Sequence, residues 1–114
     1  MYLEYFRDKW NKRLEVLINA REYVKKIKEI CIKEINKNCR VILFGSIVKG
    51  SYRIDSDVDV IVILPKIENE IERAEIASKI YKKLGIEDPI ELHVISKEEF
   101  ENWYSKFIDV YEEF

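Results

Sequence analysis

Two aspartates, Asp57 and Asp59, stand at the start of a strongly apolar segment, and the pair Gly45-Ser46 precedes them with ten residues between. Residues two apart in an extended strand point to the same face, so the two carboxylates are expected side by side. Ionised carboxylates held this close repel each other, and a hard cation such as Mg²⁺, whose ligands are oxygens, relieves the repulsion. The spacing therefore predicts a divalent metal site.

Glu91 is a third candidate for this site, because it is the one acid in the otherwise mostly apolar segment 90–95. An unpaired charge inside an apolar strand is costly, which favours a ligand or a partner for it. If segment 90–95 lies beside segment 57–64, three carboxylates can together hold two divalent ions. His93 faces the same side and could bind a phosphate or orient an acceptor, although a structural role is the interpretation we favour.

Gly45-Ser46 leaves an apolar segment and is followed by residues that fit a short helix. Backbone N–H groups at such a turn suit a phosphate, and glycine lets the chain approach it closely. Lys49 and Arg53 follow the turn and could contact the same phosphate. Bases beside an acidic cluster could equally well serve to balance its charge, and the sequence does not separate these two alternatives for Lys49 and Arg53.

The first third of the chain must form helix, since residues 1–38 contain neither glycine nor proline. An apolar row recurs every seven residues, at Leu3, Trp10, Leu17, Val24 and Cys31. Arg13 interrupts the companion row. One helix of about 30 residues would be roughly 45 Å long, so we expect either a break near Asn19 or a projecting part that needs a partner. Most of the length is expected to pack on the sheet.

The remaining elements alternate between strand and helix, which predicts an α+β fold in a single domain over residues 1–114 with its catalytic core at about 40–95. Strands are expected at 40–44, 57–64 and 90–95. Helices are expected at about 2–38, 47–51, 69–84 and 96–113, with capping residues at Asn69 and Ser96 and a glycine stop at Gly85. Six aromatic residues line the last helix, namely Phe100, Trp103, Tyr104, Phe107, Tyr111 and Phe114. They are expected to pack mainly against the sheet, with a surface for a dimer or a protein partner as the alternative for some of them.

Composition narrows the function classes. Twenty basic and twenty-two acidic residues give a net charge of −2, so the basic excess typical of strong nucleic-acid binders is missing. The longest apolar run, Val60 to Leu64, is far too short to span a bilayer, and a cytoplasmic protein is expected. Cys31 and Cys39 lack metal-binding spacing, and we expect two reduced, packed thiols.

Taken together, Phe44-Gly45-Ser46 and Asp57-Val58-Asp59-Val60 resemble the signature of the DNA polymerase beta-type nucleotidyltransferases. The short length and the ten-residue spacer are most similar to the minimal nucleotidyltransferase family, and the resemblance covers about residues 41–95. It implies a mixed three-stranded sheet, Gly45 and Ser46 on the triphosphate, and Mg²⁺, or Mn²⁺ in its place, on Asp57 and Asp59. Glu91 would be the third acid, where that family more often has aspartate, so its role as metal ligand or general base stays open.

The resemblance also implies a partner and a reaction. Minimal nucleotidyltransferases are commonly paired with HEPN-domain toxins, and they act as antitoxins that attach AMP from ATP to a tyrosine of the toxin. Two alternatives stay open, a non-catalytic antitoxin that neutralises its toxin by binding, and a transferase that modifies a small molecule. The sequence leaves the oligomeric state open as well, with a homodimer among the alternatives.

Overall fold

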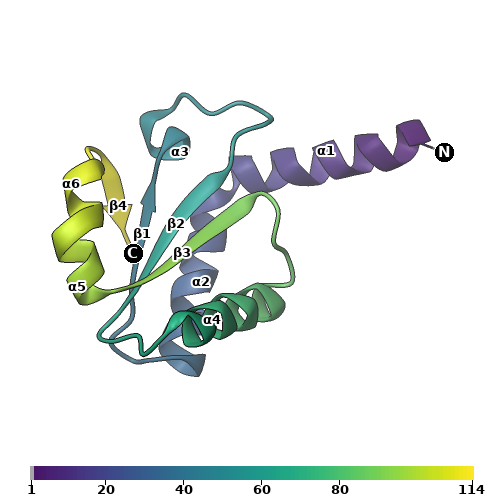
Figure 1. Ribbon diagram of the computed structural model, residues 1–114. Coiled ribbons are helices and arrows are strands. Elements are labelled where there is room, and N and C mark those ends of the chain that lie inside the picture. The colour runs from purple at the N-terminus through teal and green to yellow at the C-terminus, as the bar shows by residue number, and fades with distance from the viewer. Residues whose placement is uncertain (1) are drawn as a thin grey trace.

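A mixed four-stranded sheet forms the centre of the fold in the computed structural model, which describes residues 2–114 (Figure 1). The strands are β1 (Arg40–Phe44), β2 (Val58–Leu64), β3 (Ile90–Ser96) and β4 (Tyr111–Glu113), in the spatial order β3-β2-β1-β4. Strands β2 and β3 run parallel, and β1 is antiparallel to both β2 and β4. The three expected strands are confirmed. The expectation of a three-stranded sheet is wrong, because β4 adds a fourth strand.

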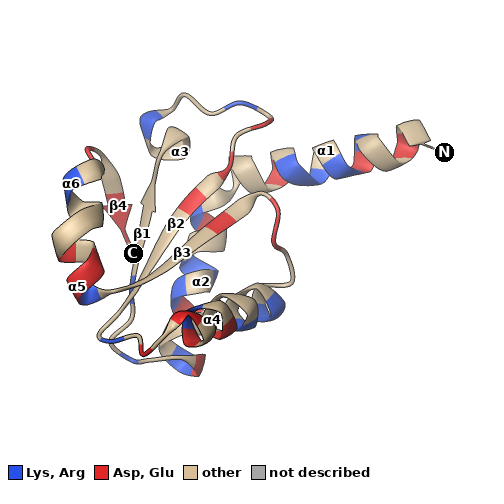
Figure 2. Ribbon diagram, in the orientation of Figure 1, with Lys and Arg blue, Asp and Glu red and all other residues tan. Residues whose placement is uncertain are grey.

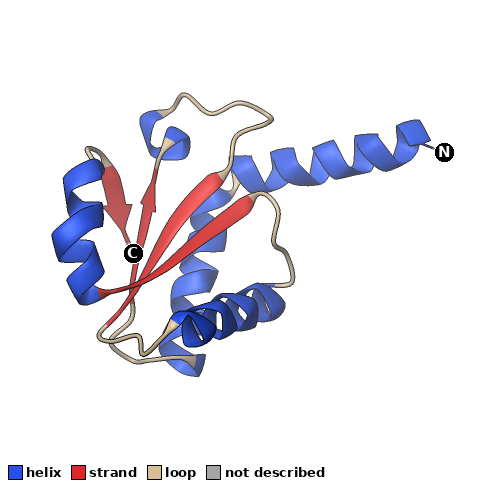
Figure 3. Cartoon of the chain, viewed as in Figure 1, coloured by secondary structure: helices blue, strands red, loops and turns tan. Residues whose placement is uncertain are grey.

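Helices cover both faces of the sheet, which confirms the α+β class (Figure 3). They are α1 (Tyr2–Ile18), α2 (Ala20–Glu34), α3 (Ser46–Lys49) and α4 (Glu70–Leu84), followed by a C-terminal helical segment of α5 (Lys97–Glu99), the π-helical turn η1 (Phe100–Tyr104) and α6 (Ser105–Phe107). Helices α2 and α4 lie on one face, and the C-terminal helical segment lies on the other.

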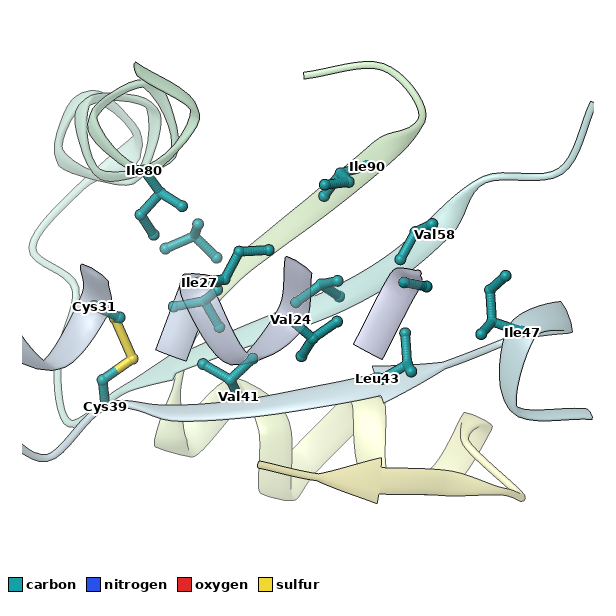
Figure 4. Close-up of a cluster of buried hydrophobic side chains, with 14 of the residues drawn as sticks. Val24, Ile27, Cys31, Cys39, Val41, Leu43, Ile47, Val58, Ile80 and Ile90 are labelled. Atoms are coloured by element: carbon teal, nitrogen blue, oxygen red, sulfur yellow. A yellow bond between two sulfur atoms is a disulfide. The ribbon is translucent and has the colours of Figure 1, made fainter. Parts of the chain in front are cut away.

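The two faces of the sheet bury different sets of side chains, because successive residues of a strand point to opposite sides. The larger core packs against α2 and α4, and it includes Val24, Ile27, Val41, Leu43, Val60, Val62 and Ile80 (Figure 4). The smaller core packs against the C-terminal helical segment and comprises Ile42, Ile61, Ile63, Ile95 and Phe100. Odd-numbered residues of β2, among them Asp59, therefore point toward the C-terminal helical segment.

The N-terminal helix breaks at Asn19, whose backbone N–H and side-chain amide both donate to the carbonyl of Glu15. Helix α1 projects away from the sheet (Figure 1), so the break and the projection both occur, and the partner expected for a projecting part stays a prediction. Only its last turns are buried, and the expectation that most of the segment packs on the sheet is confirmed for α2 and wrong for α1. The apolar residues left exposed on α1 include Tyr2, Leu3, Tyr5, Phe6 and Trp10.

The expected boundaries of α4 are confirmed. The side chain of Asn69 accepts a hydrogen bond from the N–H of Glu72, and Gly85 ends the helix with a φ of 81°. The carboxylate of Glu72 accepts from the N–H of Glu68 rather than from that of Asn69, so the reciprocal bond of the capping box goes to the preceding residue.

The helix expected at 96–113 starts as predicted, with a full capping box between Ser96 and Glu99, but it ends at Phe107. Ile108 turns the chain into an extended conformation, with φ −96° and ψ 114°, and β4 returns along β1. Two ion pairs hold β4 in place, from Glu112 to Arg21 and from Glu113 to Arg40. These partners lie far away in the sequence, which explains why helical periodicity alone missed the strand.

The aromatic residues of this segment do not share one buried face. The wide turn η1 changes the angular spacing of the side chains, so Phe100 is buried and Tyr104 half-buried, whereas Trp103 and Phe107 are 64% and 77% exposed. The expectation that this face packs mainly against the sheet is therefore wrong for Trp103 and Phe107.

Cys31 and Cys39 form a disulfide, so the expectation of reduced thiols is wrong (Figure 4). The turn after α2 brings the chain straight back into β1, and the two Cα atoms come within 6.1 Å, a distance that a disulfide spans. Both residues belong to the larger core and are almost fully buried.

None of the helices over residues 2–114 combines the length and the apolarity needed to cross a membrane.

Reduction of this disulfide should lower the free energy of unfolding by about 2–3 kcal/mol, because it removes a cross-link that restricts the unfolded chain over a short loop. Chemical denaturation with and without a thiol reductant measures the difference. The double variant Cys31→Ser/Cys39→Ser is the control and should show no response to reductant. Equal denaturation midpoints for the oxidised and reduced wild-type chain would contradict the prediction.

Candidate active site

Phe44, Asp59 and Glu91 are paired directly across three neighbouring strands, Phe44 with Asp59 and Asp59 with Glu91. This register puts the two carboxylates beside each other near the start of the parallel strands, where Figure 2 shows acidic segments on both β2 and β3. Asp59 and Glu91 lie on the face that carries the smaller core. The expected adjacency of these two acids is thus present in the structure.

His93 joins the two acids, because it lies two residues after Glu91 on the same face of β3. Its Nε2 is 4.0 Å from Oδ1 of Asp59 and 3.8 Å from Oε1 of Glu91. One ligand atom from each of Asp59, Glu91 and His93 lies within 4.8 Å of the others. Carboxylate oxygen and imidazole nitrogen are both ligands for divalent cations, so this group has the chemistry of a cation site.

The charge of this group acts on His93 itself. Interaction with the Asp59 carboxylate raises the pKa of His93 above its ordinary value, and the charge of Glu91 adds to this effect, while burial opposes it. The imidazole ring also packs near Phe44 and Tyr104, with ring centres 5.7 and 6.2 Å away. This packing agrees with the structural role we favoured for His93, and its position adds it to the candidate ligands.

Gly45 lies directly against Asp59. Its backbone has φ 83° and ψ −153°, a region that essentially only glycine adopts. A Cβ atom at this position would lie 2.5 Å from Oδ2 of Asp59, so the Asp59 carboxylate would have to shift to make room for it. Position 45 therefore requires glycine, and the Gly45-Ser46 turn and the carboxylate of Asp59 lie together as the spacing predicted.

Asp57 lies at the edge of this arrangement rather than in its centre. It precedes β2, is half exposed, and does not belong to the group of Asp59, Glu91 and His93 in the described part of the chain. Asp57 and Glu91 nevertheless line one hollow of about 370 Å³. The other residues of its lining are Tyr81, Glu87, Asp88, Pro89 and Ile90.

The two bases after the turn have other partners. Lys49 Nζ is 3.4 Å from the carboxylate of Asp109, and Arg53 Nε is 3.9 Å from that of Asp55. Within residues 2–114 neither base pairs with Asp59 or Glu91, and Arg53 is mostly exposed. Phosphate contact by Lys49 and Arg53 stays a prediction.

Arg13 lies at the edge of the site in the structure, although its place in the sequence indicated no functional role. It is only 8% exposed, and its Nη2 lies 3.9 Å from Oδ1 of Asp57. The available signal was its interruption of an apolar helical row. A charged residue on a buried helix face needs partners, and those of Arg13 are on loops whose paths the sequence did not predict.

The sequence profile described as "Nucleotidyltransferase domain" matches residues 24–112, which include the strands, the turn and the acids described above. The chain belongs to this nucleotidyltransferase family. A Methanocaldococcus jannaschii protein, provisionally named protein adenylyltransferase MJ0141, is 33% identical over 76 residues, which is 64% of this chain and 74% of the relative.

Solved structures agree with the family. The crystal structure of a provisionally named nucleotidyltransferase is 34% identical, with a TM-score of 0.64, and the match covers 79% of this chain and 95% of the other. A second crystal structure with the same provisional name, from Sulfolobus solfataricus, is 22% identical with a TM-score of 0.57, over 90% of this chain and 85% of the other. At that identity the second likeness supports the fold alone.

The contact between Gly45 and Asp59 gives a direct test of the nucleotidyltransferase site. Gly45→Ala should lower the free energy of unfolding by about 2 kcal/mol or more, because backbone strain of about 1–3 kcal/mol is added to a clash. It should also weaken binding of Mn²⁺, used as a probe cation, because Asp59 must move. Thermal unfolding and Mn²⁺ titration followed by electron paramagnetic resonance measure the two effects.

Gly85→Ala is the matched control for Gly45→Ala. Gly85 also has a positive φ, 81°, but no atom lies within 4 Å of a Cβ built on it. This variant should lose about 1 kcal/mol of stability and keep the Mn²⁺ affinity of the wild type. Equal Mn²⁺ affinities for the two alanine variants would contradict the assignment of Asp59 to the cation site.

Proposed function

We propose that this chain is a metal-dependent nucleotidyltransferase that moves AMP from ATP to a tyrosine hydroxyl of a HEPN-domain toxin and so acts as a cytoplasmic antitoxin. The observation that carries the proposal is the pairing of Asp59 with Glu91 on adjacent strands, directly beside the Gly45-Ser46 turn. A cation on these carboxylates would lie within reach of a triphosphate at the turn.

The residues present suit Mg²⁺, or Mn²⁺, because they offer mainly carboxylate oxygens. Asp59 and Glu91 would hold the cation, with Asp57 at the edge as a further oxygen ligand and His93 able to add a nitrogen ligand. When bound, the cation neutralises negative charge on the triphosphate and on the leaving pyrophosphate. The imidazole nitrogen of His93 favours Mn²⁺ over Mg²⁺ at the position next to it.

The chain's own contribution is to bind and orient the reactants. The backbone at Gly45 and Ser46 places the triphosphate against the acids, with no side chain at residue 45 to obstruct it. The acceptor oxygen then bonds to the α-phosphorus, the bond from that phosphorus to the β-phosphate oxygen breaks, and pyrophosphate leaves. The hydroxyl proton passes to water. Orientation of this kind lowers the barrier because the reacting atoms are already aligned.

Similarity to other proteins supports both the protein acceptor and the AMP group. The Methanocaldococcus jannaschii relative carries protein adenylyltransferase in its provisional name, and the sequence resembles minimal nucleotidyltransferases, whose partners are HEPN toxins. The exposed apolar residues of α1 also favour a protein partner, since such residues are typical of interaction surfaces. The same surface favours the second candidate function, neutralisation of the toxin by binding without transfer.

Conservative removal of the charges tests the proposal. Asp59→Asn and Glu91→Gln should each lower the transfer rate at least about 100-fold, the loss typical when a group that stabilises transition-state charge is removed. Both should stay folded, because each removes a like-charge neighbour of the other acid. The measurement is incubation with labelled ATP, Mg²⁺ and a HEPN protein, with mass spectrometry for an added adenylate on tyrosine.

Glu29→Gln is the control for these variants, because Glu29 is an exposed acid of α2 and lies outside the group of Asp59, Glu91 and His93. It should transfer at a rate close to that of the wild type. Transfer that persists in Asp59→Asn/Glu91→Gln would contradict the catalytic assignment. If that double variant still neutralises the toxin without transferring AMP, the binding antitoxin becomes the better account.

A further inference from the structure

Arg13 is the only charged residue among residues 2–114 whose side chain is buried, with an overall exposure of 8%. Burying a guanidinium removes water that would otherwise solvate it, and this cost is offset only by well-placed acceptors. Because Arg13 lies in the C-terminal half of α1, the contacts that satisfy it also determine what this helix holds in place.

Three acceptors surround the guanidinium. Nε donates to the carbonyl of Ile54 at 3.2 Å, Nη2 donates to the carbonyl of Ser56 at 2.6 Å, and Nη1 donates to the carboxylate of Asp88. The ring of Trp10, one turn earlier on α1, lies 5.6 Å from the guanidinium carbon. The planar fork of arginine fits several acceptors at once, and lysine cannot reproduce it.

These acceptors belong to the two loops that lead into the acidic site. Ile54 and Ser56 lie just before Asp57, in the loop between α3 and β2, and Asp88 lies in the loop between α4 and β3 (Figure 1). A backbone hydrogen bond of 2.8 Å, from the N–H of Val58 to the carbonyl of Pro89, joins the same loops. Arg13 therefore holds the two loops against α1. Its contacts lie close to Asp57, the residue directly before β2.

We propose that Arg13 is a positioning residue that holds the carboxylate of Asp57 at the edge of the cation site, an inference that rests on the proposed function. Its hydrogen bonds to residues 54 and 56 fix the backbone on which Asp57 is carried. Its positive charge lies 3.9 Å from Asp57 and in contact with Asp88. It also offsets repulsion among the acids that line the 370 Å³ hollow described above. Loss of this side chain removes the three hydrogen bonds that connect Ile54, Ser56 and Asp88 to α1.

The test uses the full chain with Arg13→Met and Arg13→Lys, the second as the variant that keeps the charge and is more certain to fold. Amides of residues 54–58 should exchange with deuterium about 10-fold faster in Arg13→Met. The dissociation constant for Mn²⁺, measured by electron paramagnetic resonance, should rise about 10-fold, the low end for residues that orient metal ligands. Arg13→Lys should show a smaller change in both measurements.

Arg21→Met is the matched control, since Arg21 forms a two-bond pair with Glu112 of β4, outside the group of Asp59, Glu91 and His93, and is half exposed. It should leave Mn²⁺ binding and exchange at 54–58 unchanged within about twofold. A change as large as that of Arg13→Met would show that general loosening of the fold explains the effect, and it would overturn the proposal.

A double-variant comparison asks whether Arg13 acts through Asp57. In an Asp57→Asn background, Arg13→Met should raise the Mn²⁺ dissociation constant by less than about twofold, because the ligand that it positions is already lost. An undiminished 10-fold rise in that background would overturn the proposal. A wild-type chain that binds Mn²⁺ but transfers no nucleotide would overturn the proposed function, whereas the binding and exchange measurements would still decide the role of Arg13.

Discussion

The register of β2 and β3 places Asp59 and Glu91 side by side, and like charges directly opposite each other in a sheet destabilise it. His93, on the same face of the sheet, lies beside both carboxylates. His93 lies within 4.0 Å of both acids, and interaction with Asp59, helped by the charge of Glu91, raises the pKa of its imidazole. Carboxylate oxygens and an imidazole nitrogen are ligands for divalent cations, and the absence of a Cβ at Gly45 makes room for the carboxylate of Asp59.

The alternation of side chains made the centre of the site predictable. Asp59 and Glu91 are each acids in apolar strands, and adjacency of the two strands was enough to bring them together. Glycine at residue 45 was expected to let the backbone approach a phosphate, which stays a prediction, and the structure shows the residue against the carboxylate of Asp59. The break at Asn19 was one of two alternatives that the length of the N-terminal segment imposed.

Other features depended on contacts that a local pattern does not contain. Strand β4 is three residues long and is held by Arg21 and Arg40 from distant elements. The local pattern of its residues therefore predicted a continuation of the preceding helix. Prediction of the disulfide would have required knowledge of how tightly the chain turns between α2 and β1. Arg13 looked like an interruption of an apolar row, because its acceptors lie on loops around residues 54–56 and 88.

The edge of the sheet next to the site is closed by side chains of α4. The hydroxyl of Tyr81 donates to the carbonyl of Ile90 and accepts from the N–H of Leu92, and Arg73 donates to the carbonyl of Val94. Edge strands covered in this way are protected from pairing with another sheet. An interaction partner would then meet the helices rather than β3, in agreement with the apolar surface left exposed on α1.

The most direct test of the central claim is a crystal structure of the chain with Mn²⁺ and a non-hydrolysable ATP analogue, with the metal located by its anomalous scattering. The account predicts an anomalous peak bound by carboxylate oxygens of both Asp59 and Glu91, and analogue phosphates against the backbone of residues 45 and 46. A peak and phosphates located away from these residues, with the two carboxylates bound to neither, would contradict it.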